Sequence, residues 1–510
     1  MSRWTELQHE AQAARGTDWR VFSNDPAAVA SQVVCAAGLR LDQGREQLRP
    51  QTWTLLYALA EKAGLQAQRA AQWSGEVVNR SEQRRVLHGA LRSPERAPAA
   101  VAAEVRASEQ QVQALVSALA ETRPGAAVLH IGIGGSDLGP RLAADVARLD
   151  SPALRPLHFL NNLDDATLAA TLAALDPADV IVVLVSKSYS TAETLELQQR
   201  VNGWLEAADV DPAAVTVAVT SNAARARETG VPAERILDLP EWVGGRYSVW
   251  SAVSVSIALA FGPAARERLR AGAAAMDTHF LDTPLEANLP ARAALCGVWH
   301  ANALAYDTRV VVPYADALKL LPEYLQQLEM ESNGKRVDQQ GRPLGHATAP
   351  ATLGGVGSCA QHAFFQLLHQ SDAVHPVEFV LPARVAGVAP EMQRQLLANA
   401  LAQACALTHG RDADGPDETR CCPGQRPSTL IGMAALDLWH LGALLAFYEH
   451  RTAVQGWIWG LNSYDQFGVE IGKTIAGTMQ RALQGDEGFP DAASAAAGEW
   501  FRGQMDALTR

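Results

Sequence analysis

Glycine and hydroxyl residues gather in two segments of the sequence whose chemistry suits a phosphate. The first is Ile131–Pro140, Ile-Gly-Ile-Gly-Gly-Ser-Asp-Leu-Gly-Pro, which sets Gly135 and Ser136 between an apolar run and a helical pattern. Glycines let the backbone approach a ligand closely, and free N–H groups at a helix start attract phosphate. Asp137 stands where the dinucleotide fingerprint needs its third glycine. The segment therefore predicts a phosphate or sugar-phosphate site rather than an NAD site; a turn without a ligand is the alternative.

The second segment again lies between a strand-like run and a helical pattern. It reads Ser-Lys-Ser-Tyr-Ser-Thr, and its candidate anion-binding residues are Ser186, Lys187, Ser188 and Thr191. Hydroxyl donors, a lysine and the positive end of a helix dipole together form a compact anion site. Glu193 follows three residues after Ser190, so a capping box explains part of the pattern without any ligand.

Charged residues beside glycines and aromatic residues mark three further segments. Arg246 lies between Gly-Gly and an aromatic-rich stretch, where it could stabilise developing negative charge or simply cap its own turn. The segment 456–473 contains Gln466 and Lys473 together with four large aromatic residues, and its lysine suits an acid or electrostatic role. The polar segment 326–335 ends in Asn-Gly-Lys and by itself predicts only a helix end.

The elements that must position these residues follow from hydrophobic patterning. Residues 1 to about 120 are predicted to be helical, and apolar strand-like runs alternate with helical patterns after residue 126, which indicates parallel α/β sheets. The predicted strands are Ala126–Ile133, Val180–Val185, Val215–Thr220, Thr308–Val312 and Val377–Leu381. The domain boundaries follow: a helical segment at 1–120, α/β domains at 121–285 and 286–485, and a helical tail at 486–510.

Composition excludes several classes of protein. The net charge of −12, from 43 basic and 55 acidic residues, argues against nucleic acid or an anionic membrane as the main partner. Six cysteines without a CxxC pair or a Cys/His cluster at zinc spacing argue against a disulfide scaffold and a metal. No signal peptide is readable, and the most apolar window, 430–448, suits a buried helix because Asp437 and His440 interrupt it. We expect a soluble, cytoplasmic protein.

At these segments the sequence resembles the phosphoglucose isomerase family, also called glucose-6-phosphate isomerase. The similarity runs from about residue 50 to 485, with the motifs in family order. The closely matching stretches are 132–140, 186–194, 244–252, 324–335, 361–370 and 462–473. The resemblance implies two SIS-type parallel-sheet α/β sandwich domains wrapped by helices, a homodimer with shared active sites, and no metal or organic cofactor. It implies the interconversion of D-glucose 6-phosphate and D-fructose 6-phosphate through a cis-enediolate.

The resemblance also assigns roles to individual residues. The residues that fall on or beside phosphate-binding positions are Gly135, Ser136, Ser186, Lys187, Ser188 and Thr191. Arg246 matches the arginine beside the enediolate. Gln466 and Lys473 match the glutamine and lysine that close over the substrate, and the lysine helps to open the sugar ring.

The sequence departs from the family at two catalytic positions. Gly355 stands where the family has its catalytic glutamate, and residues 383–387 around Ala386 contain no counterpart of the ring-opening histidine. Loss of an acid/base group costs about 10²-fold to 10⁴-fold in rate. Glu193 is the nearest intact family carboxylate and a candidate substitute base, whereas His362 and His369 lie on a helix whose pattern suits packing better than catalysis.

Three functions are compatible with this pattern. The preserved loops favour an active isomerase of glucose 6-phosphate with altered acid/base residues. Gly355 and the missing histidine favour a weak or inactive sugar-phosphate-binding relative with a regulatory role. An isomerase of another sugar phosphate would keep the loops and change the walls at 353–359. The nearly complete family pattern outside these two positions favours the active isomerase of glucose 6-phosphate.

Overall fold

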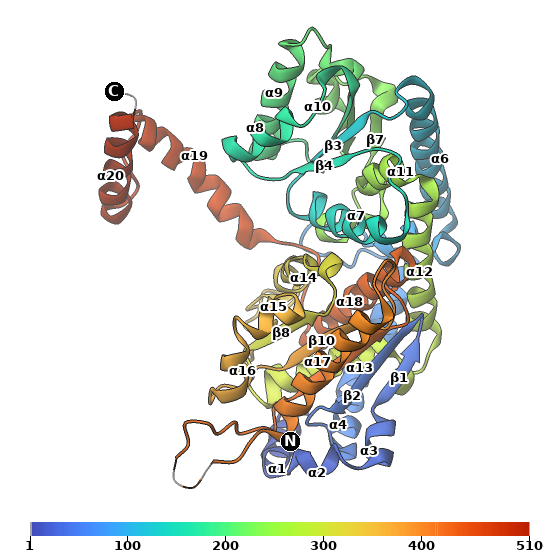
Figure 1. The fold of residues 1–510 in the computed structure, drawn as a ribbon, viewed down its shortest axis with the longest axis vertical. Coiled ribbons are helices and arrows are strands. Elements are labelled where there is room, and N and C mark those ends of the chain that lie inside the picture. The colour runs from blue at the N-terminus through green and yellow to red at the C-terminus, as the bar shows by residue number, and fades with distance from the viewer. Residues whose placement is uncertain (1–2, 414, 416, 509–510) are drawn as a thin grey trace. The chain divides into compact units, whose positions relative to one another are not determined.

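The computed structural model of the chain describes residues 3–413, 415 and 417–508 (Figure 1). The apolar runs between residues 127 and 238 form a five-stranded parallel sheet. Its strands stand in the order β4-β3-β5-β6-β7. Their bounds are β3 Ala127–Ile131, β4 Leu157–Leu160, β5 Val180–Val185, β6 Thr216–Thr220 and β7 Ile236–Asp238. Every residue of β5 is buried, as expected for a central strand covered on both faces.

A second sheet of six strands has the order β1-β2-β11-β10-β8-β9. The strands β8 Thr308–Pro313, β9 Ala351–Gly354, β10 Val377–Pro382 and β11 Ser428–Met433 are mutually parallel. The antiparallel hairpin of β1 Val33–Ala36 and β2 Leu39–Arg45 completes the sheet, with β2 paired to β11. The two SIS-type α/β layers of the sequence analysis are confirmed, but this sheet is mixed rather than all parallel.

The predicted helical character of the first 120 residues is wrong for residues 33–45. These residues form β1 and β2, and they belong to the sheet of the C-terminal half. Val33–Ala36 is short and Leu39–Arg45 carries five polar or glycine positions, so neither segment shows a clear strand pattern. The apolar window 430–448 is likewise divided between β11 and a helix that begins at Leu438. The boundaries at residues 120, 285 and 485 stay predictions.

Helices cover both sheets of the first compact unit, Met1–Ser463. Those beside the first sheet are α6 Ala99–Thr122, α7 Leu138–Asp150, α8 Asp165–Ala173, α9 Ala192–Glu206, α10 Ala223–Glu228 and α11 Val255–Phe261. The remaining helices of the unit are α1 Arg3–Arg15, α2 Trp19–Phe22, α3 Pro26–Ser31, α4 Pro50–Lys62, α5 Leu65–Ser74, α12 Pro263–Asp282, α13 Leu289–Val298, α14 Leu321–Leu325, α15 Gly357–Gln361, α16 Phe365–Gln370, α17 Pro390–His409 and α18 Leu438–Trp459.

The long helices α12 and α18 cross closely because glycines face each other at their contact. A Cβ atom on Gly272 would lie 1.7 Å from the carbonyl oxygen of Trp439, and one on Gly442 would lie 1.9 Å from that of Leu269. Both distances are far below van der Waals contact, so a larger side chain at either glycine would force the helices apart. Most of α18 is buried, and it forms the centre of the unit.

The second compact unit is Tyr464–Arg510, which contains α19 Glu470–Gln484 and α20 Ala492–Leu508. Its exposed large apolar side chains are Phe467, Val469, Ile471, Ile475, Trp500, Phe501 and Met505. The helix α20 lies within the segment 486–510 that was predicted as a helical tail, and the boundary of that tail stays a prediction. Among the described residues, no helix has both the length and the apolar character that a membrane span requires.

Candidate active site

The two predicted anion loops leave the first sheet from adjacent strands. Because β3 lies between β4 and β5, the connections that follow β3 and β5 run to opposite sides of the sheet. Ligands of open α/β sheets bind at such a switch point, beside the carboxyl ends of the strands. The loop after β3 contains the short turn Gly134–Ser136, and the loop after β5 is 186–191. The fold therefore brings Ser136 and Ser186 to the same edge.

The loop after β5 presents hydroxyl groups at the start of α9. The Oγ atoms of Ser188 and Ser190 lie 2.6 Å apart, and both residues are exposed. The Oγ of Ser186 lies 3.5 Å from Oγ1 of Thr191, at the N-cap of the helix. Tyr189 anchors the loop: it is fully buried, with a left-handed φ of 51° and its hydroxyl 3.1 Å from Oγ1 of Thr229. Hydroxyl donors at the positive end of a helix dipole are groups that could hold an anion.

Lys187 connects this loop to the segment that carries Arg246. Its ammonium donates to the backbone carbonyl oxygens of Glu241 at 3.0 Å and of Val243 at 2.7 Å. Burial, together with the positive charge of Arg84, lowers the pKa of Lys187 to about 8. The lysine therefore positions the 241–243 segment and adds positive charge behind the hydroxyl groups.

His130 forms a hydrogen bond to the loop after β3. This histidine of β3 is fully buried; its Nε2 lies 2.7 Å from the carbonyl oxygen of Ser136 and its Nδ1 3.0 Å from Oγ of Ser256. Burial lowers the pKa of His130 to about 4. The imidazole is therefore neutral at pH 7, and it donates from Nε2 to the carbonyl while Nδ1 accepts from the serine hydroxyl. Sequence reasoning missed this residue because it looks like an ordinary position in an apolar strand.

We expect His130 to make folding stability depend on pH between about 6.5 and 4. In this window the unfolded chain binds a proton that the folded chain does not, so stability falls as the pH falls. A plot of the free energy of unfolding against pH should be steeper for the unmodified protein than for His130→Asn, by up to about 1.4 kcal/mol per pH unit. Urea unfolding of both proteins at a series of pH values measures this difference in slope. The other histidines are the same in both proteins, so their contributions cancel in the difference. Parallel curves would contradict the assignment of a neutral His130.

Arg246 reaches the loop after β3 through a close backbone contact. A Cβ atom on Gly135 would lie 2.2 Å from the carbonyl oxygen of Gly245, so only glycine permits this approach. The Oγ of Ser248 donates to the carbonyl oxygen of Gly135 at 3.2 Å. These contacts join the predicted phosphate loop directly to the predicted arginine.

The guanidinium of Arg246 is buried and held by three groups. Nε donates to Oγ of Ser332 at 2.6 Å, Nη2 donates to the carbonyl oxygen of Ser463 at 2.7 Å, and Nη1 lies 3.3 Å from Oε2 of Glu331. Several fixed partners orient a planar cation, which is what electrostatic stabilisation of a developing oxyanion requires.

Glu331 belongs to a π-helical segment, Gln326–Glu331, where the sequence analysis expected an ordinary helix end. Such widened turns occur frequently at functional sites. The segment contacts several parts of the site: the amide nitrogen of Gln327 would lie 2.9 Å from a Cβ atom on Gly134, and the backbone N–H of Thr352 in β9 donates to the sulfur of Met330 at 3.3 Å. Glu331 is thus a carboxylate beside Arg246 that the sequence analysis did not single out.

Gly355 directly follows β9, and its N–H donates to the carbonyl oxygen of Val311 at 3.2 Å. A Cβ atom there would meet the ring of Phe364 at 3.6 Å and Cβ of Ala360 at 3.8 Å, which are ordinary contacts. Packing therefore leaves room for a Cβ atom at the family base position.

The other acid/base candidates of the sequence analysis lie in different surroundings. Glu193 is exposed on the first turn of α9. His362 is exposed, and His369 lies 2.9 Å from Oε1 of Gln403 on α17. Gln466 precedes the turn Phe467–Val469, and Lys473 is exposed on α19; both belong to the second compact unit.

A buried charged cluster supports the Arg246 segment. The ring of Tyr247 stacks on His88 at 4.4 Å, and Trp250 donates to Oε1 of Glu449 at 2.7 Å. Arg92 forms two hydrogen bonds of 2.8 Å to Asp277 and a further one to Glu449. Burial alone would raise the pKa of Asp277, but Arg92 and His450 hold it well below its usual range. Burial raises the pKa of Glu449.

The two sheets, with the switch point of the first, define the chain as an SIS-type α/β protein. A model of the phosphoglucose isomerase family matches residues 42–498. The chain belongs to this family.

Individual relatives agree with the assignment. The glucose-6-phosphate isomerase of Polaromonas naphthalenivorans is 43% identical over 456 residues, covering 87% of each chain. That of Dechloromonas aromatica is 38% identical over 499 residues, covering 95% of each. The crystal structure of a glucose-6-phosphate isomerase from Chlamydia trachomatis superimposes with a TM-score of 0.89, at 32% identity and with 98% of each chain covered.

Proposed function

We propose that the chain is an aldose–ketose isomerase that interconverts D-glucose 6-phosphate and D-fructose 6-phosphate. The observation that carries the proposal is the contact of the Gly135 loop with Gly245, which sets a phosphate-binding edge beside a buried, oriented arginine. A sugar phosphate held by its phosphate at this edge would present its reacting carbons to Arg246. Membership of the phosphoglucose isomerase family supports the same reaction.

The phosphate is held by groups of the two loops. The hydroxyls of Ser136, Ser186, Ser188 and Thr191, with the N-terminus of α9, supply the donors, and Gly135 lets the backbone approach. Lys187 adds long-range positive charge through its place behind the loop. Arg246 stabilises the negative oxygen of the enediolate that forms when C2 loses its proton.

Proton transfer between C2 and C1 needs a base, and we assign this role to Glu331. Its carboxylate lies 3.3 Å from Nη1 of Arg246, so a base and the cation that stabilises the enediolate share one place. The base takes the proton from C2 and returns it to C1. Glu193, the substitute base of the sequence analysis, is the competing assignment; it is exposed on α9.

The two assignments predict different variants to lose activity. We expect Glu331→Gln to lower kcat on fructose 6-phosphate by about 10²-fold or more, because amides do not accept the proton, and Glu193→Gln to leave kcat unchanged. A coupled assay of glucose 6-phosphate formation measures both. The acidic limb of the kcat–pH profile should disappear in Glu331→Gln only, which separates loss of a base from a disturbed ion pair. The reverse pattern would assign the base to Glu193.

Turnover and binding distinguish the isomerase from a protein that only binds sugar phosphates. The isomerase requires measurable conversion of fructose 6-phosphate by the unmodified chain. A rise in melting temperature with fructose 6-phosphate, without conversion, would replace the proposal with a sugar-phosphate sensor.

Three further features complete the proposal. Gln466 and Lys473 match the family residues that close over the substrate, with Lys473 assisting ring opening. The chain works as a homodimer in the cytoplasm; the exposed apolar side chains of the second unit, among them Ile471 and Trp500, support self-association.

A further inference from the structure

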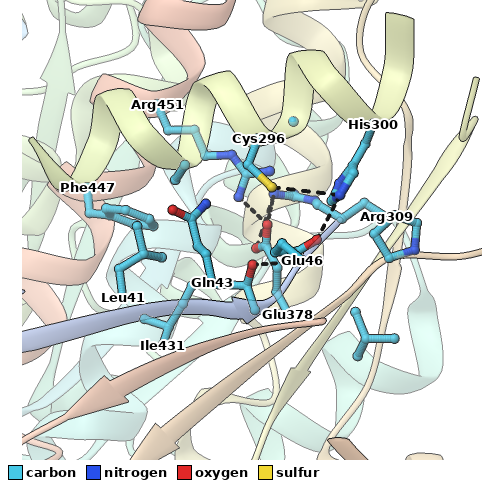
Figure 2. Close-up of a pocket in the computed structure, with 15 residues that line it drawn as sticks. Leu41, Gln43, Glu46, Cys296, His300, Arg309, Glu378, Ile431, Phe447 and Arg451 are labelled. Carbon is cyan, nitrogen blue, oxygen red and sulfur yellow. Dashed lines mark hydrogen bonds and ion pairs between the residues drawn. The ribbon is translucent and has the colours of Figure 1, made fainter. Parts of the chain in front are cut away.

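A second group of reactive side chains lies near the amino ends of β8, β10 and β11, where Arg309, Glu378 and Thr429 are each the second residue of their strand. Figure 2 shows Glu46, Cys296 and His300 pointing toward one another in this pocket. Glu46 comes from the loop after β2, Cys296 from α13, and His300 from the π-helical segment Trp299–Ala303 that continues α13. The proposed reaction uses none of these residues.

The three donor atoms converge, with His300 and Glu46 at hydrogen-bond distance, so a bound zinc ion would require Nε2 and Oε2 to separate by about 0.6 Å. Nε2 of His300 lies 2.8 Å from Oε2 of Glu46 and 3.7 Å from Sγ of Cys296, and all three donor atoms lie within 4.8 Å of one another. Tetrahedral zinc with its usual bond lengths separates a sulfur from a nitrogen ligand by about 3.6 Å. Glu46 and Cys296 are buried, and His300 is 12% exposed.

The surroundings orient the Glu46 carboxylate, which already contacts His300. Oγ1 of Thr429 donates to Oε1 of Glu46 at 2.6 Å, which orients the carboxylate as an outer hydrogen bond orients a metal ligand. The two guanidiniums of the pocket are matched by other carboxylates: Arg309 pairs with Glu329 and Glu378, and Arg451 also pairs with Glu378.

The free space beside these residues has room for one occupant. Gln43 is buried and its amide faces the pocket in Figure 2; because its Nε2 is a hydrogen-bond donor, it suits the sulfur of Cys296 or a water molecule rather than the cation itself. The pocket has a free volume of about 10 Å³, which suits a single small ion or water. A divalent ion bound to one carboxylate and one thiolate would leave no net charge.

We propose that Glu46, Cys296 and His300 bind a divalent transition-metal ion, with zinc as the ion that this mixed oxygen, sulfur and nitrogen donor set fits best. The ion ties the N-terminal hairpin to α13 beneath the second sheet, so its role is structural. Sequence spacing could not show the site, because Glu46 and His300 are 254 residues apart. The expectation of a metal-free protein is revised by this proposal.

The test uses zinc and cobalt with the full-length protein. Protein from zinc-supplemented culture is expected to contain about one zinc ion per chain by mass spectrometry of the metal. After chelator treatment, Co²⁺ should give a near-ultraviolet thiolate-to-cobalt band, and Zn²⁺ should raise the melting temperature. Cys296→Ser should abolish both responses. Cys359→Ser, at an exposed cysteine of another region, is the matched control and should retain both.

His300→Gln provides a second variant, which keeps a donor for Glu46 and keeps the test valid if Cys296→Ser misfolds. It should also lose the cobalt band and the response to zinc. Zinc-free protein with no cobalt band and no change in melting temperature would overturn the proposal, and the three residues would then form only a hydrogen-bonded cluster. A band that survives Cys296→Ser would overturn it as well.

Discussion

In the Glu331→Gln protein, Gly355→Glu is expected to raise turnover on fructose 6-phosphate by about 10²-fold, the lower end of what a positioned base contributes. The local packing permits the substitution at its first atom, because a Cβ atom at this position meets only ordinary van der Waals contacts with Phe364 and Ala360. Steady-state kinetics in the coupled assay measure it. The gain should appear in kcat, with little change in KM, because the phosphate loops are untouched.

Gly355→Gln is the matched control, since glutamine has the same size but cannot act as a base. Equal activities of the Glu and Gln variants would show that position 355 no longer faces the reacting carbons. The substitution also tests Glu331. If Glu331 is the present base, Glu331→Gln should cost much less in the Gly355→Glu protein than in the unmodified one, because a second base is then available.

Arg92→Met is expected to lower the free energy of unfolding by about 3–5 kcal/mol, since it leaves the buried carboxylates of Asp277 and Glu449 without their cation. The cluster joins the 88–96 segment to α12 and α18, so the loss should act on the whole first unit. Chemical unfolding followed by fluorescence measures the shift of the midpoint.

Arg96→Met is the control, four residues away and of the same chemistry. Arg96 forms two hydrogen bonds to Asp282 at 2.7 and 2.5 Å, but this pair is solvent-exposed. Exposed ion pairs contribute less than about 1 kcal/mol. Equal losses for Arg92→Met and Arg96→Met would contradict the importance assigned to burial.

Strands that are buried on both faces could be predicted from the sequence, and edge strands could not. The continuous apolar run Val180–Val185 matches β5 residue for residue, because a central parallel strand must be apolar throughout. The β2 strand, Leu39–Arg45, includes Asp42, Gln43 and Gly44, and it is a strand because β11 pairs with it from the other end of the chain. No local pattern carries that information.

The site was predictable where one continuous segment supplies both ligand groups and backbone geometry. The Ser136 and Ser186 loops are such segments, and they follow adjacent strands of the first sheet. Residues that act through distant contacts escaped prediction. Glu331 stands out only through its contact with Arg246, which lies 85 residues earlier. His130 stands out only through its hydrogen bond to the carbonyl oxygen of Ser136, and the sequence of its strand gives no sign of that bond.

The pairing of β2 with β11 has a consequence for the biosynthesis of the chain. Glu46 and Thr429, which are hydrogen-bonded in the finished sheet, are separated by 383 residues. At ribosomal speeds of about 5–20 residues per second, the hairpin emerges roughly 20–80 s before its partner strand. During that interval the first sheet is complete and able to fold, while the hairpin carries an unpaired edge that can join another nascent chain. The yield of native protein should therefore depend on translation rate and on chaperones that shield this edge.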